Sequence, residues 1–175
     1  MQKIVRGKPY QLEAAKKCFR RILEEETLPL SEEDFTVAFV EERVFVLCEN
    51  SRVYGFACTS RDLPSSLFPN QDHAFGKLED LLEQIDDLGE DQVVITCLGV
   101  DPICAYQEQG KQILNAVKVN YHNPTLLALI EPTAIKQIEF FKRSGFVIAK
   151  GYKEQGKLLL VRKEVKEGLA RGLAW

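Results

Sequence analysis

The sequence is poor in the residues that bind metals or form disulfides. Only two histidines, His73 and His122, occur in 175 residues, and the five cysteines are widely spaced with no Cys-x-x-Cys pair. This pattern argues against a structural zinc site, so no metal ligands are expected. An odd number of scattered thiols instead favours reduced cysteines in the core of a cytoplasmic protein. These cysteines are Cys18, Cys48, Cys58, Cys97 and Cys104.

Long apolar runs and an excess of charge of one sign are also missing. No stretch approaches the roughly 20 apolar residues of a membrane helix, and Met1–Ile4 is not followed by the apolar run of a signal peptide. The net charge is only −3, which predicts neither a nucleic-acid partner nor a membrane partner. Hydrophobic residues make up 45% of the chain, which is enough to bury the core of one domain.

The N-terminal third predicts a short strand followed by helices. The strand covers residues 3–6, and apolar residues then recur at helical spacing until the chain reaches Thr27–Pro29. Ser31 is typical of a helix cap, but residues 35–40 fit either a helical turn or a strand. The apolar positions with helical spacing are Leu12, Ala15, Phe19, Ile22 and Leu23.

A hairpin and an acidic insertion follow. Residues 43–48 and 53–59 flank a turn and predict two antiparallel strands, and Gly55 indicates a bulge or a close approach of two backbones. Residues 61–90 then form an insertion, whose acidic helix covers residues 72–88. The charged face of this helix is either a solvated surface or a lid that favours a cationic substrate such as a polyamine or lysine.

The second half of the chain predicts two parallel strands joined through a helix. Residues 93–98 are apolar and β-branched, which is typical of a central strand buried on both faces. A helix over 107–121 separates them from a second apolar strand at 125–130, so the two strands run parallel. The remaining predicted elements are a helix from Pro132 to Gly145, a strand pair at 146–150 and 158–162, and a weakly helical tail at 164–175.

This order of elements predicts one α/β domain with a mixed sheet over residues 1–163. Three motifs within it resemble the GNAT superfamily of N-acetyltransferases. Val53–Ala57 is similar to the third strand "(I/V)-x-G-F-A", and Leu98–Pro102 is similar to the fourth strand "L-x-V-x-P". Ile138–Phe146 is similar to the last helix, "(A/I)-x-x-F-Y-E-K-x-G-F". Together the motifs imply the GNAT fold, elaborated by the helical insertion.

The resemblance implies an enzyme that transfers an acetyl group from acetyl-CoA to a primary amine on a small molecule or a protein. In this family the amine attacks the thioester directly, and acetyl-CoA lies between two parallel strands, which here would part near Val100 and Ile130. The helix that begins at Gln107 would bind the pyrophosphate. The cofactor-binding residues implied are Leu98, Gly99, Val100, Gln107, Glu108, Gln109, Gly110 and Phe141.

The sequence departs from the family pattern in the acyl-CoA loop and in the last helix. The loop pattern (R/Q)-x-x-G-x-(G/A) falls on residues 105–110, where only Gly110 matches and Glu108 replaces a glycine. The family's tyrosine acid falls on Phe141, and its asparagine falls on Ala134. The alternative is therefore a GNAT-fold protein that acts as a non-catalytic binding or regulatory module. A transferase of a different acyl group is a third hypothesis.

The candidates for acid–base chemistry are Glu131, His122 and Tyr106. Glu131 follows a strand end, where α/β sheets bind ligands, and it can equally cap the next helix. His122 is either a general base or a solvated turn residue. Cys97 fits a small core residue better than a nucleophile. The tyrosines that could replace the missing acid are Tyr106, Tyr121 and Tyr152, and the apolar tail residues that suit a homodimer contact are Leu169, Leu173 and Trp175.

Overall fold

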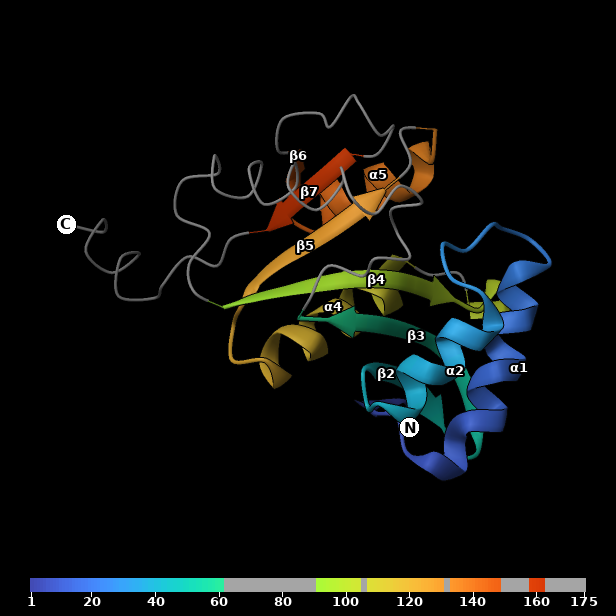
Figure 1. Ribbon diagram of the computed structural model, residues 1–175. Helices are drawn as coiled ribbons and strands as arrows, with labels where there is room; N and C mark the ends of the chain where they lie inside the picture. The colour runs from blue at the N-terminus through green and yellow to red at the C-terminus, as the bar shows by residue number, and fades with distance from the viewer. Residues whose placement is uncertain (62–90, 105–106, 131–132, 149–157, 163–175) are drawn as a thin grey trace.

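A mixed seven-stranded sheet carries helices on both of its faces (Figure 1). The computed structural model describes residues 1–61, 91–104, 107–130, 133–148 and 158–162. The strands are β1 (Lys3–Arg6), β2 (Val44–Glu49), β3 (Arg52–Ser60), β4 (Gln92–Val100), β5 (Thr125–Ile130), β6 (Val147–Ile148) and β7 (Leu158–Arg162). The helices are α1 (Leu12–Leu23), α2 (Glu32–Val40), α4 (Gln107–Asn120) and α5 (Ile135–Arg143), with short 3-10 turns η1 (Pro9–Gln11) and η3 (Pro102–Cys104).

The sheet order is β1-β2-β3-β4-β5-β7-β6. Among the described strands only β4 and β5 pair in parallel, and α4 provides the crossover that a parallel pair requires. The predicted parallel pair is therefore confirmed, as are the β2–β3 hairpin and the final strand pair. The mixed α/β fold class is confirmed with them.

The N-terminal helices follow the predicted pattern with one difference at a boundary. Ser31 caps α2 by accepting the N–H of Asp34 at 3.1 Å, and the ambiguous segment 35–40 is helical. Helix α1 ends at Leu23 and not at Thr27–Pro29. Three consecutive glutamates follow Leu23, and negative charge at the C-terminal end of a helix opposes its dipole.

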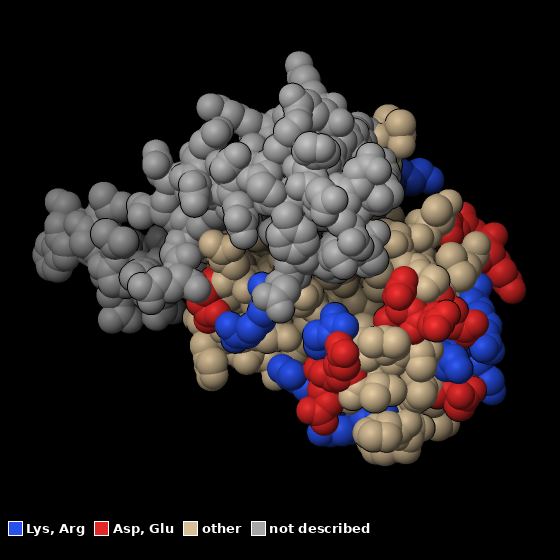
Figure 2. All heavy atoms as spheres, viewed as in Figure 1, with Lys and Arg blue, Asp and Glu red and all other residues tan. Residues whose placement is uncertain are grey.

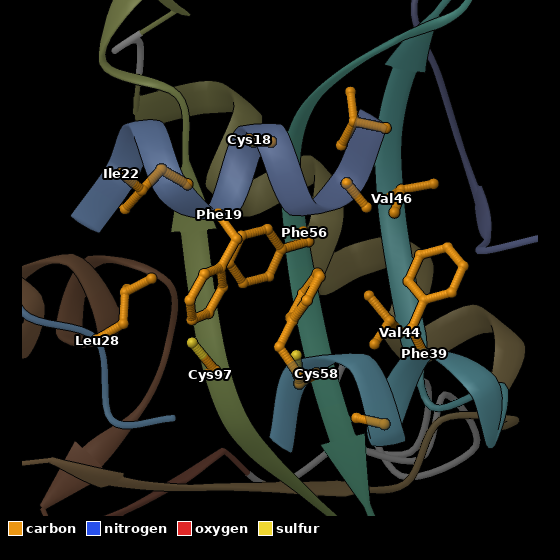
Figure 3. Close-up of a cluster of buried hydrophobic side chains, with 14 of the residues drawn as sticks. Cys18, Phe19, Ile22, Leu28, Phe39, Val44, Val46, Phe56, Cys58 and Cys97 are labelled. Carbon is orange, nitrogen blue, oxygen red and sulfur yellow. The ribbon is translucent and has the colours of Figure 1, made fainter. Parts of the chain in front are cut away.

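One apolar cluster lies between the sheet and the pair α1 and α2 (Figure 3). Three aromatic rings form its centre: the Phe35 ring lies 4.8 Å from both Phe19 and Phe56, and Phe19 lies 5.8 Å from Phe56. Each of these residues is fully buried. This cluster fixes α1 and the segment after it against β3 and β4.

A second apolar cluster lies on the opposite face of the sheet, under α4 and α5. Helix α4 contributes Ile113, Leu114 and Val117, which are fully buried and belong to the same apolar cluster as residues of β2, β3, β4 and β5. Helix α5 contributes Phe141, whose ring packs edge-on against Phe146 at 5.0 Å. The central strands are thus buried on both faces, as the run at 93–98 predicts.

Several predicted boundaries are wrong by a few residues. The last helix begins at Ile135 and not at Pro132, because a turn closed by the Ile135 N–H and the Thr133 carbonyl precedes it. Strand β4 continues to Val100, and β6 (Val147–Ile148) begins one residue later than predicted, whereas the predicted strand end at 149–150 lies outside the described residues. The insertion at 62–90 and the tail at 163–175, with its homodimer residues, lie outside the described residues. Within the described ranges, no helix has the length and apolar content needed to span a bilayer.

Candidate functional site

Strands β4 and β5 part halfway along their length. Their parallel pairing runs from Gln92 and Thr125 to Ile95 and Ala128 and ends there, although β4 continues to Val100 and β5 to Ile130. On its other side β4 stays paired with β3, as far as Gly55 and Val100. The open ends of the two strands border a cavity of about 350 Å³.

A bulge in β4 accounts for this parting. Cys97 pairs with Cys58, but Ile95 pairs with the next residue, Thr59, so Thr96 is an extra residue in β4. A bulge bends its strand and increases the local twist. Because Thr96 directly follows the last residue that pairs with β5, the bend turns β4 away from its parallel neighbour at this point.

The cavity is lined from both faces of the sheet. Gly110 of α4 and Phe140 and Phe141 of α5 line it on one face, whereas Glu26 and Pro29 come from the segment between α1 and α2. Lys136 and Gln137, in the first turn of α5, complete the rim. The strand residues that line it are Ile95, Thr96, Cys97, Leu98, Val100, Ala128 and Ile130. Two molecules that entered from opposite faces would meet between the strands.

Two glycines allow close packing beside this cavity. A Cβ atom at Gly110 would lie 2.7 Å from Cζ of Phe140, so a larger residue here would require the Phe140 ring to shift. A Cβ atom at Gly55 would lie 3.0 Å from the carbonyl oxygen of Gly99, which confirms the predicted close approach of two backbones. The associated bulge in β3 falls on Tyr54, next to Gly55, since Leu47 pairs with Gly55 and Cys48 with Val53.

A buried carboxylate holds the chain where it leaves β4. Asp101 is 1% exposed, and its Oδ2 accepts from Nε of Arg21 in α1 at 2.6 Å. Its Oδ1 accepts the backbone N–H of Ile103 at 3.1 Å, and its own N–H donates to the carbonyl of Tyr54. Asp101 therefore ties the end of β4 to α1, to β3 and to the turn η3.

The structure brings together some of the predicted cofactor-binding residues. Leu98, Val100, Gly110 and Phe141 line the cavity, whereas Gly99 is buried against Ile22 of α1. The Glu108 side chain is exposed, and Nε2 of Gln109 donates to Oε1 of Gln2. Three predicted site residues lie outside the described part of the chain: Tyr106, Glu131 and Tyr152. The side chain of Gln107 lies outside it as well.

The structure does not bring His122 to the cavity. This residue is exposed in the turn after α4, where its φ of 58° is in the left-handed region. The turn leads into Thr125, which pairs with Gln92 at the beginning of β4, whereas the cavity lies at the ends of both strands. Tyr121 is near the same end, where its hydroxyl lies 2.8 Å from Oγ1 of Thr59.

Cys97 is a wall residue of the cavity and 3% exposed, as expected for a small core residue (Figure 3). It lies opposite Cys58, and burial, together with the hydrogen bond to Cys97, raises the pKa of the Cys58 thiol well above its usual range. A thiol held in its neutral form is a poor nucleophile. In the described parts of the chain, no three His, Cys, Asp or Glu side chains converge as a metal site would require.

Sequence reasoning missed the charged residues at the rim. Glu26 follows the end of α1, and Lys136 is the second residue of α5. Because these elements are far apart in the sequence, no local pattern indicates that both residues line one cavity. Burial and the neighbouring Glu25 raise the pKa of the Glu26 carboxyl, and Lys136 opposes that shift. The Lys136 ammonium is thus close enough to interact electrostatically with this carboxylate.

No family model and no curated relative matches the sequence, but solved structures do. The ribosomal-protein-S18-alanine N-acetyltransferase of Escherichia coli is 18% identical, with a TM-score of 0.62 over 95% of this chain and 97% of that one. A GNAT-family acetyltransferase of Streptococcus agalactiae is 8% identical, with a TM-score of 0.69 over 94% of this chain and 96% of that one. The PaiA N-acetyltransferase of Thermoplasma acidophilum, solved with coenzyme A, is 10% identical, with a TM-score of 0.64 over 94% of this chain and 99% of that one. At these identities the likeness shows a shared fold, so the chain has the GNAT acetyltransferase fold.

Proposed function

From the GNAT fold and the cavity between the parted strands, we propose that this chain transfers an acetyl group from acetyl-CoA to a primary amine. The observation that supports it is a single cavity whose walls come from both faces of the sheet. Donor and acceptor can then meet without an enzyme-bound intermediate. Holding two reactants in one site converts a bimolecular reaction into an effectively unimolecular one.

The walls of the cavity fit the donor. Leu98, Val100 and Phe141 present an apolar lining for a thin chain such as pantetheine, and the unpaired strand edges leave backbone groups for its amides. The first turn of α4, near Gly110, would receive the pyrophosphate, because unpaired N–H groups at a helix N-terminus favour anions. Acetyl-CoA supplies the activated acetyl group as a thioester.

The acceptor would enter from the side of α1 and α2, where Glu26 and Pro29 line the rim. Its amine nitrogen forms a bond to the acetyl carbonyl carbon as the carbon–sulfur bond breaks. An acceptor that enters as an ammonium ion first gives one proton to water, because a protonated nitrogen has no free electron pair. The neutral nitrogen then loses one proton as it forms the amide, and the leaving thiolate gains one, so the charges balance. A backbone N–H at the free edge of β4, near Val100, would stabilise the negative charge that develops on the carbonyl oxygen.

We expect acetyl-CoA to bind the purified chain and CoA to be released when an acceptor amine is added. Isothermal titration measures the first, and a thiol reagent that reacts with free CoA measures the second. Desulfo-CoA, which keeps the pyrophosphate and most of the pantetheine arm, is a matched control that should bind but give no thiol signal. Absence of binding heat at millimolar acetyl-CoA would contradict the proposal.

The non-catalytic alternative rests on Phe141, which lines the cavity and has no proton to donate. If the acetyl transfer is slow only because this acid is missing, Phe141→Tyr should raise kcat roughly 10-fold or more, since a positioned acid contributes at least that much. Phe140→Tyr is the matched control, because this ring also lines the cavity and packs against Phe141 at 5.4 Å.

A higher kcat in Phe141→Tyr than in the wild-type chain and Phe140→Tyr would support a transferase that is slowed only by the missing acid. Binding of acetyl-CoA with no CoA release from the wild-type chain or from either variant would favour the binding-module alternative.

A further inference from the structure

Glu26 and Lys136 carry opposite charges on the same rim. They are the only charged residues among the described ones that line the cavity, and the rest of the lining is mainly apolar. Glu26 comes from the segment after α1 and Lys136 from the first turn of α5, so two separate elements bring opposite charges to one cavity. In a mainly apolar lining, two charges of opposite sign determine which ligands can enter.

The two side chains interact without forming an ion pair. Burial and Glu25 raise the pKa of the Glu26 carboxyl and Lys136 opposes this rise, yet no ion pair joins Glu26 and Lys136 in the part of the chain that the structure describes. A ligand can therefore lie between the two groups and pair with both. Both residues are exposed at the rim, so their charged groups are accessible to a ligand that carries complementary charges.

The side of the rim that carries Glu26 is the acidic one. Glu24 and Glu25 precede Glu26 in the chain, and acidic side chains gather over this end of α1 on the face shown in Figure 2. Negative charge beside a binding cleft raises the local concentration of cations. An ammonium group would thus approach from the side of α1, which is the side proposed for the acceptor.

Resting on the proposed function, we propose that the acceptor is a small zwitterion of the amino-acid class, whose ammonium group binds Glu26 and whose carboxylate binds Lys136. A simple amine would leave Lys136 unpaired. A diamine would bring a second positive charge towards Lys136, and like charges at close range are unfavourable. An acceptor with a carboxylate near its amine matches both charges at once.

The test compares leucine with 3-methylbutylamine, its decarboxylated analogue, and with leucinamide, at saturating acetyl-CoA. The same comparison for arginine and agmatine includes an acceptor with a second positive charge. CoA release should show a kcat/KM for the amino acids that exceeds that for the matched amines and the amide by roughly 30-fold or more, since a lost charged contact has effects of this order.

Three variants assign the effect to the rim. Lys136→Met should abolish the preference for the carboxylate and leave the KM for acetyl-CoA unchanged. Glu26→Gln should lower kcat/KM for the amino acid and the amine alike, because both carry the ammonium group. Lys142→Met is the matched control, because this lysine is exposed on α5 and does not line the cavity.

Equal kcat/KM values for leucine and 3-methylbutylamine would overturn the zwitterion proposal and leave the acetyltransferase proposal in place. A raised KM for acetyl-CoA in Lys136→Met would overturn it as well, because Lys136 would then bind a phosphate of the donor. If none of these acceptors led to CoA release, the zwitterion proposal would be overturned, whereas absence of acetyl-CoA binding would overturn the acetyltransferase proposal.

Discussion

Replacing Asp101 by alanine should lower the free energy of unfolding by about 3 kcal/mol, because it removes the partner of a partly buried charge. Asp101 Oδ2 lies 2.6 Å from Nε of Arg21 and 3.9 Å from the guanidinium of Arg52. The substitution also leaves the N–H of Ile103 without its acceptor. Urea unfolding measures the loss, and the melting temperature should fall by about 6–12 °C.

Asp91→Ala is the matched control for this prediction. It breaks the pair between Arg61 and Asp91, which has the same 2.6 Å separation but side chains that are 59% and 48% exposed. Exposed pairs contribute less than about 1 kcal/mol. If the two variants lost the same stability, burial of Asp101 would not be the source of its contribution.

Phenylalanine at position 128 should weaken acetyl-CoA binding at least 100-fold, which corresponds to roughly 3 kcal/mol of binding free energy. Ala128 is the last residue of β5 that pairs with β4, and its side chain lines the cavity. The added ring would project into the space of about 350 Å³ between the strands. Ala128 is also 1% exposed and part of the apolar cluster under α4 and α5, so the ring should both block the ligand and lower the free energy of unfolding by about 1–3 kcal/mol. Isothermal titration with acetyl-CoA measures the effect.

Ala128→Val separates a blocked cavity from a damaged sheet. Valine suits a strand and adds little volume, so affinity should stay within roughly threefold of the wild type. Both variants should keep the circular dichroism spectrum of the wild type. A folded Ala128→Phe protein that bound acetyl-CoA normally would show that the donor does not lie between β4 and β5.

The order of strands and helices could be predicted because each element carries a local pattern. The apolar run at 93–98 and the strand Thr125–Ile130 are separated by one helix, and that separation alone dictates a parallel pair. Boundaries were less predictable. The end of α1 depends on charge at the helix terminus, which the apolar spacing of residues 12–23 does not report.

The walls of the cavity could be predicted only where a motif marks them. Leu98, Val100, Gly110 and Phe141 belong to motifs, and all four line the cavity. The bulge at Thr96 has no sequence signature of its own, since any residue can be the extra one in a strand.

Long-range charge contacts were beyond prediction for a different reason. Arg21 and Asp101 are 80 residues apart, and Glu26 and Lys136 belong to elements on different sides of the sheet. Neither helical nor strand periodicity carries information about such pairs. They become visible only when the sheet brings the ends of α1, β4 and α5 together.

Because β4 and β5 pair over only part of their length, the sheet consists of two halves that are weakly joined. Strands β1 to β4 form one continuously bonded half and β5 to β7 another, and only four residue pairs join the halves across the seam. Helix α4 packs on the first half, against β1 to β4, and Ile113, Leu114 and Val117 share one apolar cluster with residues of β5. A molecule that forms hydrogen bonds with the free edges of both β4 and β5 would supply a link between the strands that the protein itself lacks. Binding of such a molecule between β4 and β5 would therefore hold the two halves together. Resistance to heat and to proteases should increase as more of the protein has the molecule bound.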